Sequence, residues 1–267
     1  MSVKDAISNI VTAFKTKDIH FTYLVFLSTI VSSPSTMQFF PESIIKRINS
    51  KLDIYIKSRK IIINIKNSKF LIHDSASFRV IQPSFENSVW KIVESLDIKC
   101  FVDVGAHIGK YTIPLAKLGV NVLAIEPDPE NFNILKYNVL LNNVSDKVKL
   151  MNCACYSKNG HLKLYIESGS DVRSIFGDGK YILVKAKKLD TLIKENKIRP
   201  DLIKIDVEGA EKDVLEGSYE TLQSYHPELI IEVWNRNFKD VLKFLQFLGY
   251  KHKVIEEWKP CKILYFY

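Results

Sequence analysis

The sequence predicts an α/β fold built on a mostly parallel β-sheet with helices on both faces. From about residue 101, short apolar runs alternate with helical patterns, the order typical of parallel sheets. A glycine-bearing turn joins the first of these strands to a helix, and two closely spaced apolar runs at the end predict an antiparallel edge. We therefore expect an α/β core over residues 98–267. Residues 1–97 should form a mainly helical cap or lid with a short hairpin.

The N-terminal region predicts helices over residues 3–14, 19–32, 41–58 and 85–96, with a linker at 33–41. Alternating apolar residues at 61–65 and 70–72 predict a hairpin that turns around Asn67 and Ser68. The apolar stretch 21–31 falls short of the ~18 residues that span a bilayer, so we expect no transmembrane segment. This stretch could be core, a homodimer face or an interfacial membrane contact.

In the core, apolar runs predict strands over residues 100–104, 120–125, 147–155, 160–166, 181–186, 202–205, 229–233, 250–255 and 262–267. Helices are expected over 110–118, 129–142, from the acidic turn 206–211 to about 222, and over 237–248. Asp128 should cap the second of these, with Pro129 at its first position. Gly119 and Gly249 mark helix ends.

The chain has 267 residues and a formal net charge of +8. Residues 1–100 contain 14 Lys and Arg against 8 Asp and Glu, so most of the excess lies there. Such basicity suits nucleic acid, an anionic membrane surface or an acidic substrate, and it suits an ordinary solvated surface equally. The segment 46–69 contains a single acidic residue, Asp53, and eight basic residues. These are Lys46, Arg47, Lys51, Lys57, Arg59, Lys60, Lys66 and Lys69.

The four cysteines form no C-x-x-C pair, which argues against a zinc site. They are Cys100, Cys153, Cys155 and Cys261. We expect free, mostly buried thiols, as is usual in a reducing compartment, and therefore a cytoplasmic protein.

The most informative segment runs from Phe101 to Thr112, FVDVGAHIGKYT. Its glycines allow a sharp turn and close approach of a ligand to the helix start. The spacing D-x-G-x-x-x-G lacks the middle glycine of dinucleotide-binding turns. Asp103 would repel a pyrophosphate but suits the cationic ammonium and sulfonium of S-adenosylmethionine. Glu126, about 20 residues beyond the turn, is placed to accept ribose hydroxyls.

These segments, DVGAHIGKYT, IEPDPEN, LIKIDVEGAE and a terminal LGY, resemble the FkbM-type family of S-adenosylmethionine-dependent methyltransferases. The resemblance covers about residues 98–255 and implies a seven-stranded, Rossmann-like sheet and O-methylation of sugars or secondary metabolites. His107 departs from the family's more common Asn. By resemblance, residues 152–154 would line the adenine pocket. The predicted cofactor contacts are Asp103, Gly105, Ala106, His107, Gly109, Thr112, Glu126, Pro127, Asn152, Ala154 and Asp206.

A hydroxyl acceptor must be aligned and must lose its proton. The candidate catalytic residues follow predicted strands, where open α/β sheets bind ligands: Asp206, Glu208, His107 and Glu232. Glu208 and Glu211 could instead charge the first turn of the next helix, and His107 could simply order the glycine turn. Asp206, Glu232 and Asn235 could hold one Mg²⁺, an alternative to the metal-free site that we favour.

The sequence leaves three functions to compare. The first is O-methylation of a hydroxyl on a sugar, glycolipid or other small molecule, with Arg173 in a polar loop as a contact for an anionic substrate. The second is RNA methylation, with the basic segment 46–69 contacting phosphates. The third is an inactive binding module of the same fold, against which the intact glycine turn and Asp206 argue.

Overall fold

The computed structural model describes residues 9–13, 15–31, 41–166 and 173–267. The chain folds as two compact units, residues 1–87 with 137–143, and residues 88–136 with 144–267. It passes from the first unit to the second at Asn87 and Ser88, before the predicted boundary at residues 97 and 98. Most of the predicted linker, and residues 3–8 and 14 of the first predicted helix, lie outside the described residues.

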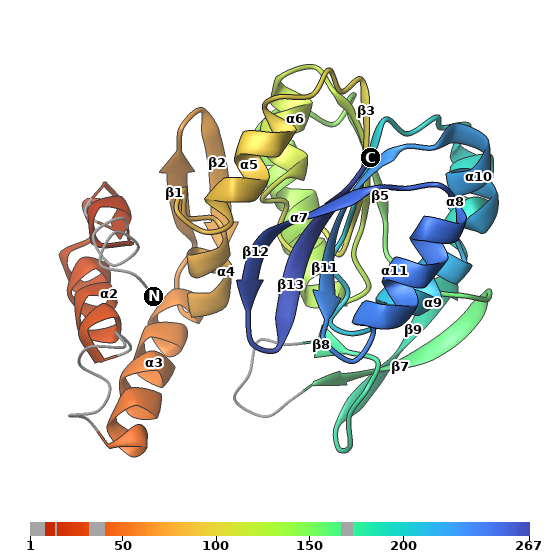
Figure 1. Cartoon of the computed structure of the whole chain (residues 1–267). Coiled ribbons are helices and arrows are strands. Elements are labelled where there is room, and N and C mark those ends of the chain that lie inside the picture. The colour runs from red at the N-terminus through yellow and green to blue at the C-terminus, as the bar shows by residue number, and fades with distance from the viewer. Residues whose placement is uncertain (1–8, 14, 32–40, 167–172) are drawn as a thin grey trace. The chain divides into compact units, whose positions relative to one another are not determined.

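A seven-stranded sheet forms the centre of the second unit, in the order β12-β13-β11-β10-β3-β4-β5 (Figure 1). All neighbouring pairs are parallel except those that β13 makes with β11 and β12. The mostly parallel sheet with an antiparallel edge is therefore confirmed. Its strands are β3 (Cys100–Val104), β4 (Asn121–Ile125), β5 (Val148–Met151), β10 (Leu202–Ile205), β11 (Glu228–Trp234), β12 (His252–Trp258) and β13 (Cys261–Phe266).

The direction of strand addition reverses beside β3. From β3 the chain adds β4 and β5 on one side, whereas β10 and β11 lie on the other side. In open α/β sheets, ligands bind outside the carboxyl ends of the strands at such a switch point. The fold therefore directs attention to the loops that follow β3 and β10.

Helices cover both faces of this sheet, as predicted (Figure 1). One face packs against side chains from four helices in a continuous buried core. These are α8 (Leu189–Asn196), α9 (Glu211–Glu216), α10 (Tyr219–Tyr225) and α11 (Phe238–Phe247). The other face carries α6 (Thr112–Lys117) and the start of α7 (Pro129–Leu141). Positive φ angles at Gly119 and Gly249 follow the ends of α6 and α11, so both predicted helix ends are confirmed.

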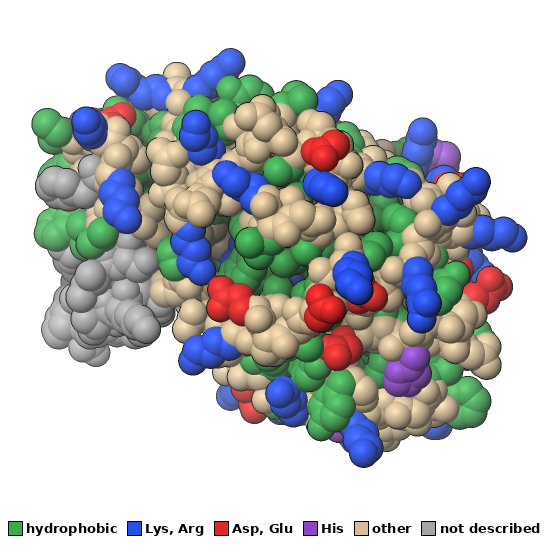
Figure 2. All heavy atoms as spheres, turned by 90° about the horizontal axis from the view of Figure 1, so that it is seen from above, with side chains coloured by type: hydrophobic (Ala, Val, Ile, Leu, Met, Phe, Trp, Pro, Cys, Tyr) green, Lys and Arg blue, Asp and Glu red, His purple; other side chains and the backbone are tan. Residues whose placement is uncertain are grey.

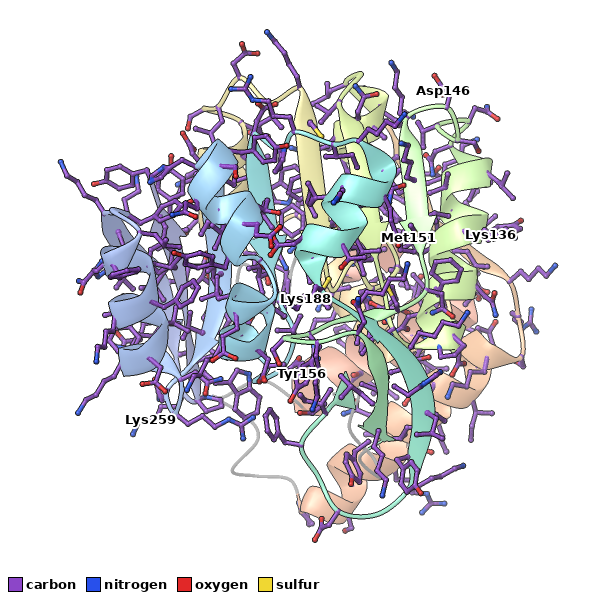
Figure 3. All side chains as sticks on the ribbon, turned by 90° about the vertical axis from the view of Figure 1, so that its right-hand side faces the viewer. Lys136, Asp146, Met151, Tyr156, Lys188 and Lys259 are labelled. Atoms are coloured by element: carbon purple, nitrogen blue, oxygen red, sulfur yellow. The ribbon has the colours of Figure 1, made fainter. Side chains whose placement is uncertain are left out.

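A smaller four-stranded sheet has the order β6-β9-β7-β8. Its strands are β6 (Ala154–Cys155), β7 (Gly160–Ile166), β8 (Arg173–Ser174) and β9 (Tyr181–Lys187). The single strand predicted over 147–155 is therefore wrong, because its halves belong to different sheets. The Asn152 amide donates to the carbonyls of Glu126 and Pro127, at 2.8 and 3.2 Å, in place of a strand pairing. Figure 3 labels Met151 before this break and Tyr156 after it.

Three predicted helices differ from those observed. Residues 107–111 form a turn ahead of α6, because His107 and Gly109 adopt φ of 50° and 98°. The helix expected at 85–96 is α5 (Asn87–Val93), preceded by Glu86 at φ 53°. The helix expected to reach 222 breaks at Gly217 between α9 and α10, where a Cβ would lie 2.1 Å from the Tyr156 carbonyl oxygen.

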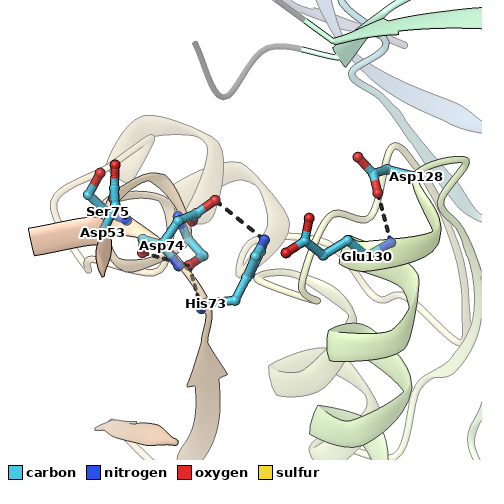
Figure 4. Close-up of polar contacts among 7 residues, drawn as sticks. Asp53, His73, Asp74, Ser75, Asp128 and Glu130 are labelled. Carbon is cyan, nitrogen blue, oxygen red and sulfur yellow. Dashed lines mark hydrogen bonds and ion pairs between the residues drawn. The ribbon is translucent and has the colours of Figure 1, made fainter. Parts of the chain in front are cut away.

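The first unit contains α2 (Ile19–Val31), α3 (Glu42–Lys57), a hairpin of β1 (Ile61–Ile65) and β2 (Ser68–Ile72), and α4 (Ser75–Val80). Ile65 pairs with Ser68, so the hairpin turns at Lys66 and Asn67, one residue before the predicted turn. The pattern of residues 75–80 did not predict α4. Its N-terminus is capped by Asp74, which accepts from the Ser77 amide at 2.7 Å. The His73 Nε2 and Asp74 Oδ2 atoms lie 3.4 Å apart, and Figure 4 shows the two side chains together.

The end of α7 belongs to this first unit and is joined to β2 by hydrogen bonds. The side chain of Asn138 is fully buried and exchanges two hydrogen bonds with the backbone of Leu71. Asn142 does the same with Lys69. Two amide side chains thus replace a neighbouring strand and satisfy the edge of β2.

All four cysteines are free, and Cys153, Cys155 and Cys261 are buried while Cys100 is partly exposed. The predicted free thiols are therefore confirmed. Among the described residues, no helix is both long and apolar enough to cross a bilayer.

Candidate active site

The predicted site residues of the second unit gather at the carboxyl ends of four adjacent strands. Asp103 lies in β3, Glu126 directly follows β4, Asp206 directly follows β10, and Glu232 lies in β11. The strand order β11-β10-β3-β4 makes these segments neighbours. The group therefore spans the switch point, as the sequence pattern predicted.

The glycine turn after β3 packs directly against the loop after β10. Gly105 has φ +83°, and a Cβ there would lie 1.9 Å from the Asp206 carbonyl oxygen. The Asp206 amide donates to the Val104 carbonyl at 3.0 Å, and the Gly105 and Ala106 amides both donate to Ile125. Only glycine fits this position, because both the backbone conformation and the space exclude a side chain.

The second glycine of the turn, Gly109, allows close packing against Leu135 of α7. A Cβ there would lie 2.8 Å from a methyl carbon of Leu135 in α7. This contact differs from the predicted reason for the second glycine, which was close approach of a ligand. Its absent side chain lets α7 lie against the turn. Asp128 caps α7 as predicted, accepting from the Glu130 amide at 2.7 Å (Figure 4).

Glu126 is buried and holds the turn from the side of β4. Its carboxylate accepts from the His107 amide at 2.8 Å and from the Asp128 amide at 2.9 Å. Burial raises the pKa of Glu126 to about 7, although these backbone hydrogen bonds oppose the shift. Each carboxylate oxygen has a second lone pair, so Glu126 can still accept a ligand hydroxyl.

Asp103 is buried and shares its surroundings with Lys204, which sequence analysis missed. The two residues pair across β3 and β10, and the Thr112 hydroxyl donates to Asp103 at 2.7 Å. Burial raises the pKa of Asp103, while Lys204 and Thr112 oppose the shift. Lys204 also forms a 2.8 Å ion pair with Asp206. One buried ammonium thus lies between two of the predicted acidic residues.

Glu208 and Glu232 carry strongly shifted carboxyl groups at the same edge. Burial, assisted by the charge of Asp206, raises the pKa of Glu208 to about 7. The same two causes raise the pKa of Glu232 to about 9, with Glu208 adding to the shift. The Cys261 thiol donates to Glu232 at 3.2 Å. Clustered carboxyls with raised pKa values are typical of functional sites.

Hydrogen bonds to Glu211, which is fully buried, hold the loop over residues 206–211 in place. Its carboxylate accepts from the Gly209 amide at 2.6 Å and from the side chain of Asn237. Asn237 also donates to the Gly209 carbonyl at 2.7 Å. Glu211 therefore fixes the loop that carries Glu208. Nothing in the sequence pattern marked Asn237 as part of the site.

The remaining predicted residues lie nearby or are only partly described. Asn152 is exposed beside the Glu126 and Pro127 carbonyls, and Ala154 is buried in β6. Asn235 is exposed beyond β11, where its amide donates to Pro260. Arg173 lies in β8, but its side chain is outside the described residues.

Comparisons with known proteins agree with this geometry. Residues 103–252 match the family described as "Methyltransferase FkbM domain". Methyltransferase sdnD of Sordaria araneosa is 29% identical over 171 residues, covering 50% of this chain and 65% of that protein. Hexuronic acid methyltransferase AglP of Haloferax volcanii is 28% identical over 147 residues, covering 54% of this chain and 59% of that protein.

A crystal structure of methyltransferase FkbM from Methylobacillus flagellatus shares the fold, with a TM-score of 0.50 and 16% identity. The similarity covers 99% of this chain and 59% of that one. The chain thus spans less than two thirds of the length of these three proteins. The family match extends over more than half of the chain and includes the glycine turn and the acidic loop. The chain belongs to the FkbM methyltransferase domain family.

Proposed function

We propose that the protein is an S-adenosylmethionine-dependent methyltransferase that methylates a hydroxyl oxygen on a sugar, glycolipid or other small molecule. The observation that carries the proposal is the cluster of Glu126, Asp206, Glu208 and Glu232 at the switch point of the sheet. The family match and the relative named as a hexuronic acid methyltransferase support it.

The charges of this cluster fit a cationic cofactor. Burial and neighbouring carboxylates, Asp206 above all, raise the pKa values of Glu208 and Glu232, so a nearby positive charge would favour their ionised forms. S-Adenosylmethionine carries an ammonium and a sulfonium. When bound, it supplies an activated methyl group and leaves as a neutral thioether.

The residues around the glycine turn would hold the adenosine part of this cofactor. Glu126 is placed to accept ribose hydroxyls with the lone pairs that the His107 and Asp128 amides leave unused. Asn152 and Ala154 would border the adenine. Asp103 supports the turn through Thr112, and its direct contact with the cofactor stays a prediction.

Glu208 is the best candidate for the base that takes the acceptor's proton. A general base works best when its pKa lies near the working pH, and the pKa of Glu208 is raised to about 7. Glu232, with a pKa raised to about 9, keeps its proton at neutral pH and can donate a hydrogen bond. Asp206 is paired with Lys204, so it would orient rather than deprotonate. The backbone amide of His107 donates a hydrogen bond to Glu126, so His107 would help to order the turn.

The test combines cofactor titration with a labelled methyl-transfer screen against glycans, lipids and total RNA. We expect calorimetric binding of S-adenosylmethionine, transfer to a hydroxyl acceptor, and a loss of about 10²- to 10⁴-fold in kcat for Glu208→Gln, as for other general bases. Glu220→Gln, which changes an exposed carboxylate, is the matched control. Cofactor binding without transfer to any acceptor class would favour the inactive binding module. Absence of cofactor binding would refute the proposal.

A second candidate is an RNA methyltransferase. Its specific support is that the described basic side chains of residues 47–69 are all exposed: Arg47, Lys51, Lys57, Arg59, Lys60, Lys66 and Lys69. Figure 2 shows basic side chains spread over the face in view, which fits a solvated surface equally well. Methyl transfer to RNA that falls steeply with salt and is lost when Lys57, Arg59 and Lys60 become Gln would select this candidate.

A Mg²⁺ ion held by Asp206, Glu232 and Asn235 stays a prediction. Such an ion could lower the pKa of the acceptor hydroxyl. If it does, EDTA should abolish turnover and Mg²⁺ should restore it. Turnover that is insensitive to EDTA would exclude this role.

A further inference from the structure

Arg236 lies just beyond β11 and is exposed. Its guanidinium carbon lies over two aromatic rings, 4.3 Å from the centroid of Phe176 and 5.1 Å from that of Trp234. Guanidinium–aromatic contacts of this kind restrict the side chain and leave its N–H donors available. The contacts therefore hold the cation in place without neutralising it.

The backbone of Gly209 packs closely against the Arg236 guanidinium. A Cβ at Gly209 would lie 2.0 Å from a terminal nitrogen of Arg236, so the glycine leaves the space that the guanidinium fills. Gly209 directly follows Glu208, the candidate base. The guanidinium therefore lies against the same loop that carries the proposed chemistry.

The segment from Ser174 to Phe176 is hydrogen-bonded to this loop. The Ser174 hydroxyl donates to the Glu208 carbonyl at 2.9 Å, and the Phe176 amide donates to the Ser174 hydroxyl at 3.1 Å. These bonds fix the position from which Phe176 contacts Arg236. Phe176 after β8, Gly209 in the acidic loop and Trp234 at the end of β11 thus surround one cation.

Arg236 forms no ion pair with any other residue in the described ranges 9–13, 15–31, 41–166 and 173–267. Two other cations at these strand ends are already paired: buried Lys204 with Asp206, and Lys262 of β13 with Glu257. A restricted guanidinium with five donors favours a carboxylate or phosphate, which it can bind through two parallel hydrogen bonds. An anionic ligand is thus the missing counterpart of this side chain.

Resting on the proposed function, we propose that Arg236 binds an oxyanion of the methyl acceptor, so that the enzyme selects acidic sugars over neutral ones. The acidic group would be held beside the loop that carries Glu208, and a hydroxyl of the same acceptor would face the base.

The experiment measures binding of D-glucuronate, D-glucose 6-phosphate and D-glucose by ligand-observed NMR, with S-adenosylhomocysteine present. We expect at least one anionic sugar to bind about tenfold more tightly than glucose, the size of a charge-assisted hydrogen bond. The two anions distinguish a carboxylate from a phosphate. Equal binding of all three sugars, or no detectable binding, would overturn the proposal.

Three variants locate the effect. Arg236→Gln should remove the preference for the anion, and Arg236→Lys should retain part of it, because lysine keeps the charge but lacks the planar fork. Arg199→Gln removes an equal charge from an exposed position before β10, at the opposite end of the strand, and should change nothing. A preference that survives in Arg236→Gln would contradict the assignment.

Cofactor titration separates this proposal from the proposed function. Wild type and Arg236→Gln should bind S-adenosylmethionine equally well. If the variant alone loses cofactor affinity, then Arg236 contacts the cofactor's own carboxylate, and the acceptor proposal is wrong. If wild type fails to bind the cofactor, then the proposed function fails, whatever the sugars do.

Discussion

Replacing Glu208 with Gln should stabilise the cofactor-free protein at pH 8 but not at pH 5. Burial, with Asp206 and Glu211 adding to it and Lys204 opposing it, raises the pKa of Glu208 from 4.5 to about 7. Between these values the folded protein holds a proton that the unfolded chain has released. Stability therefore falls as the pH rises from about 4.5 to about 7 and stays lowered above that. Gln carries no charge at either pH and avoids this loss.

The size of the effect follows from the shift. Each pKa unit is worth about 1.4 kcal/mol, so ionised Glu208 costs about 3 kcal/mol at pH 8. Neighbouring carboxyls titrate with it and Gln loses some contacts, so we expect a net gain of about 1–3 kcal/mol. With an unfolding entropy of about 2 cal/mol/K per residue, the melting temperature should rise by roughly 2–6 °C.

Thermal unfolding of wild type, Glu208→Gln and the exposed control Glu220→Gln at pH 5 and pH 8 measures this difference. The first variant should match wild type at pH 5 and exceed it at pH 8, while the control should follow wild type at both. A Glu208→Gln protein that is less stable than wild type at pH 8, or equally shifted at both pH values, would show that burial does not disfavour the charge as argued.

Three further changes test other parts of the fold. Glu126→Gln leaves one of two backbone amides facing an amide nitrogen, so calorimetry should show S-adenosylmethionine affinity reduced about 10- to 100-fold; unchanged affinity would contradict the role of this carboxylate. Gly105→Ala places a Cβ 1.9 Å from the Asp206 carbonyl oxygen, so it should abolish cofactor binding and lower the melting temperature; a wild-type melting curve would refute the close approach. Asn138→Ala strands the buried N–H and C=O of Leu71, which should cost about 2–4 kcal/mol in urea unfolding; a loss below 0.5 kcal/mol would contradict it.

The parts of the site that the sequence predicts are those encoded by local patterns. Asp103, Gly105 and Glu126 follow or end short apolar runs, and the carboxyl ends of parallel strands meet at one edge. Their convergence therefore follows from spacing alone. The same holds for Asp206, which comes directly after a strand of only four residues.

Features that depend on distant partners escape such an analysis. Lys204 interrupts an apolar strand, and such a residue is normally expected to face solvent. In the structure it is buried beside Asp103, its partner on the adjacent strand. Asn237 acquires its role only because Glu211 lies beneath the acidic loop. The apolar run over 147–155 is continuous in sequence, and nothing in it marks the change of sheet after Met151.

One of the two outer strands of the large sheet, β12, has a consequence for assembly. The pairing of β12 with β13 shifts register between Val254 and Glu256, and Lys253 and Glu257 are exposed along β12. Irregular, charged edge strands resist extension by a strand from another molecule. The β12 edge should therefore not take part in self-association of this protein through strand pairing.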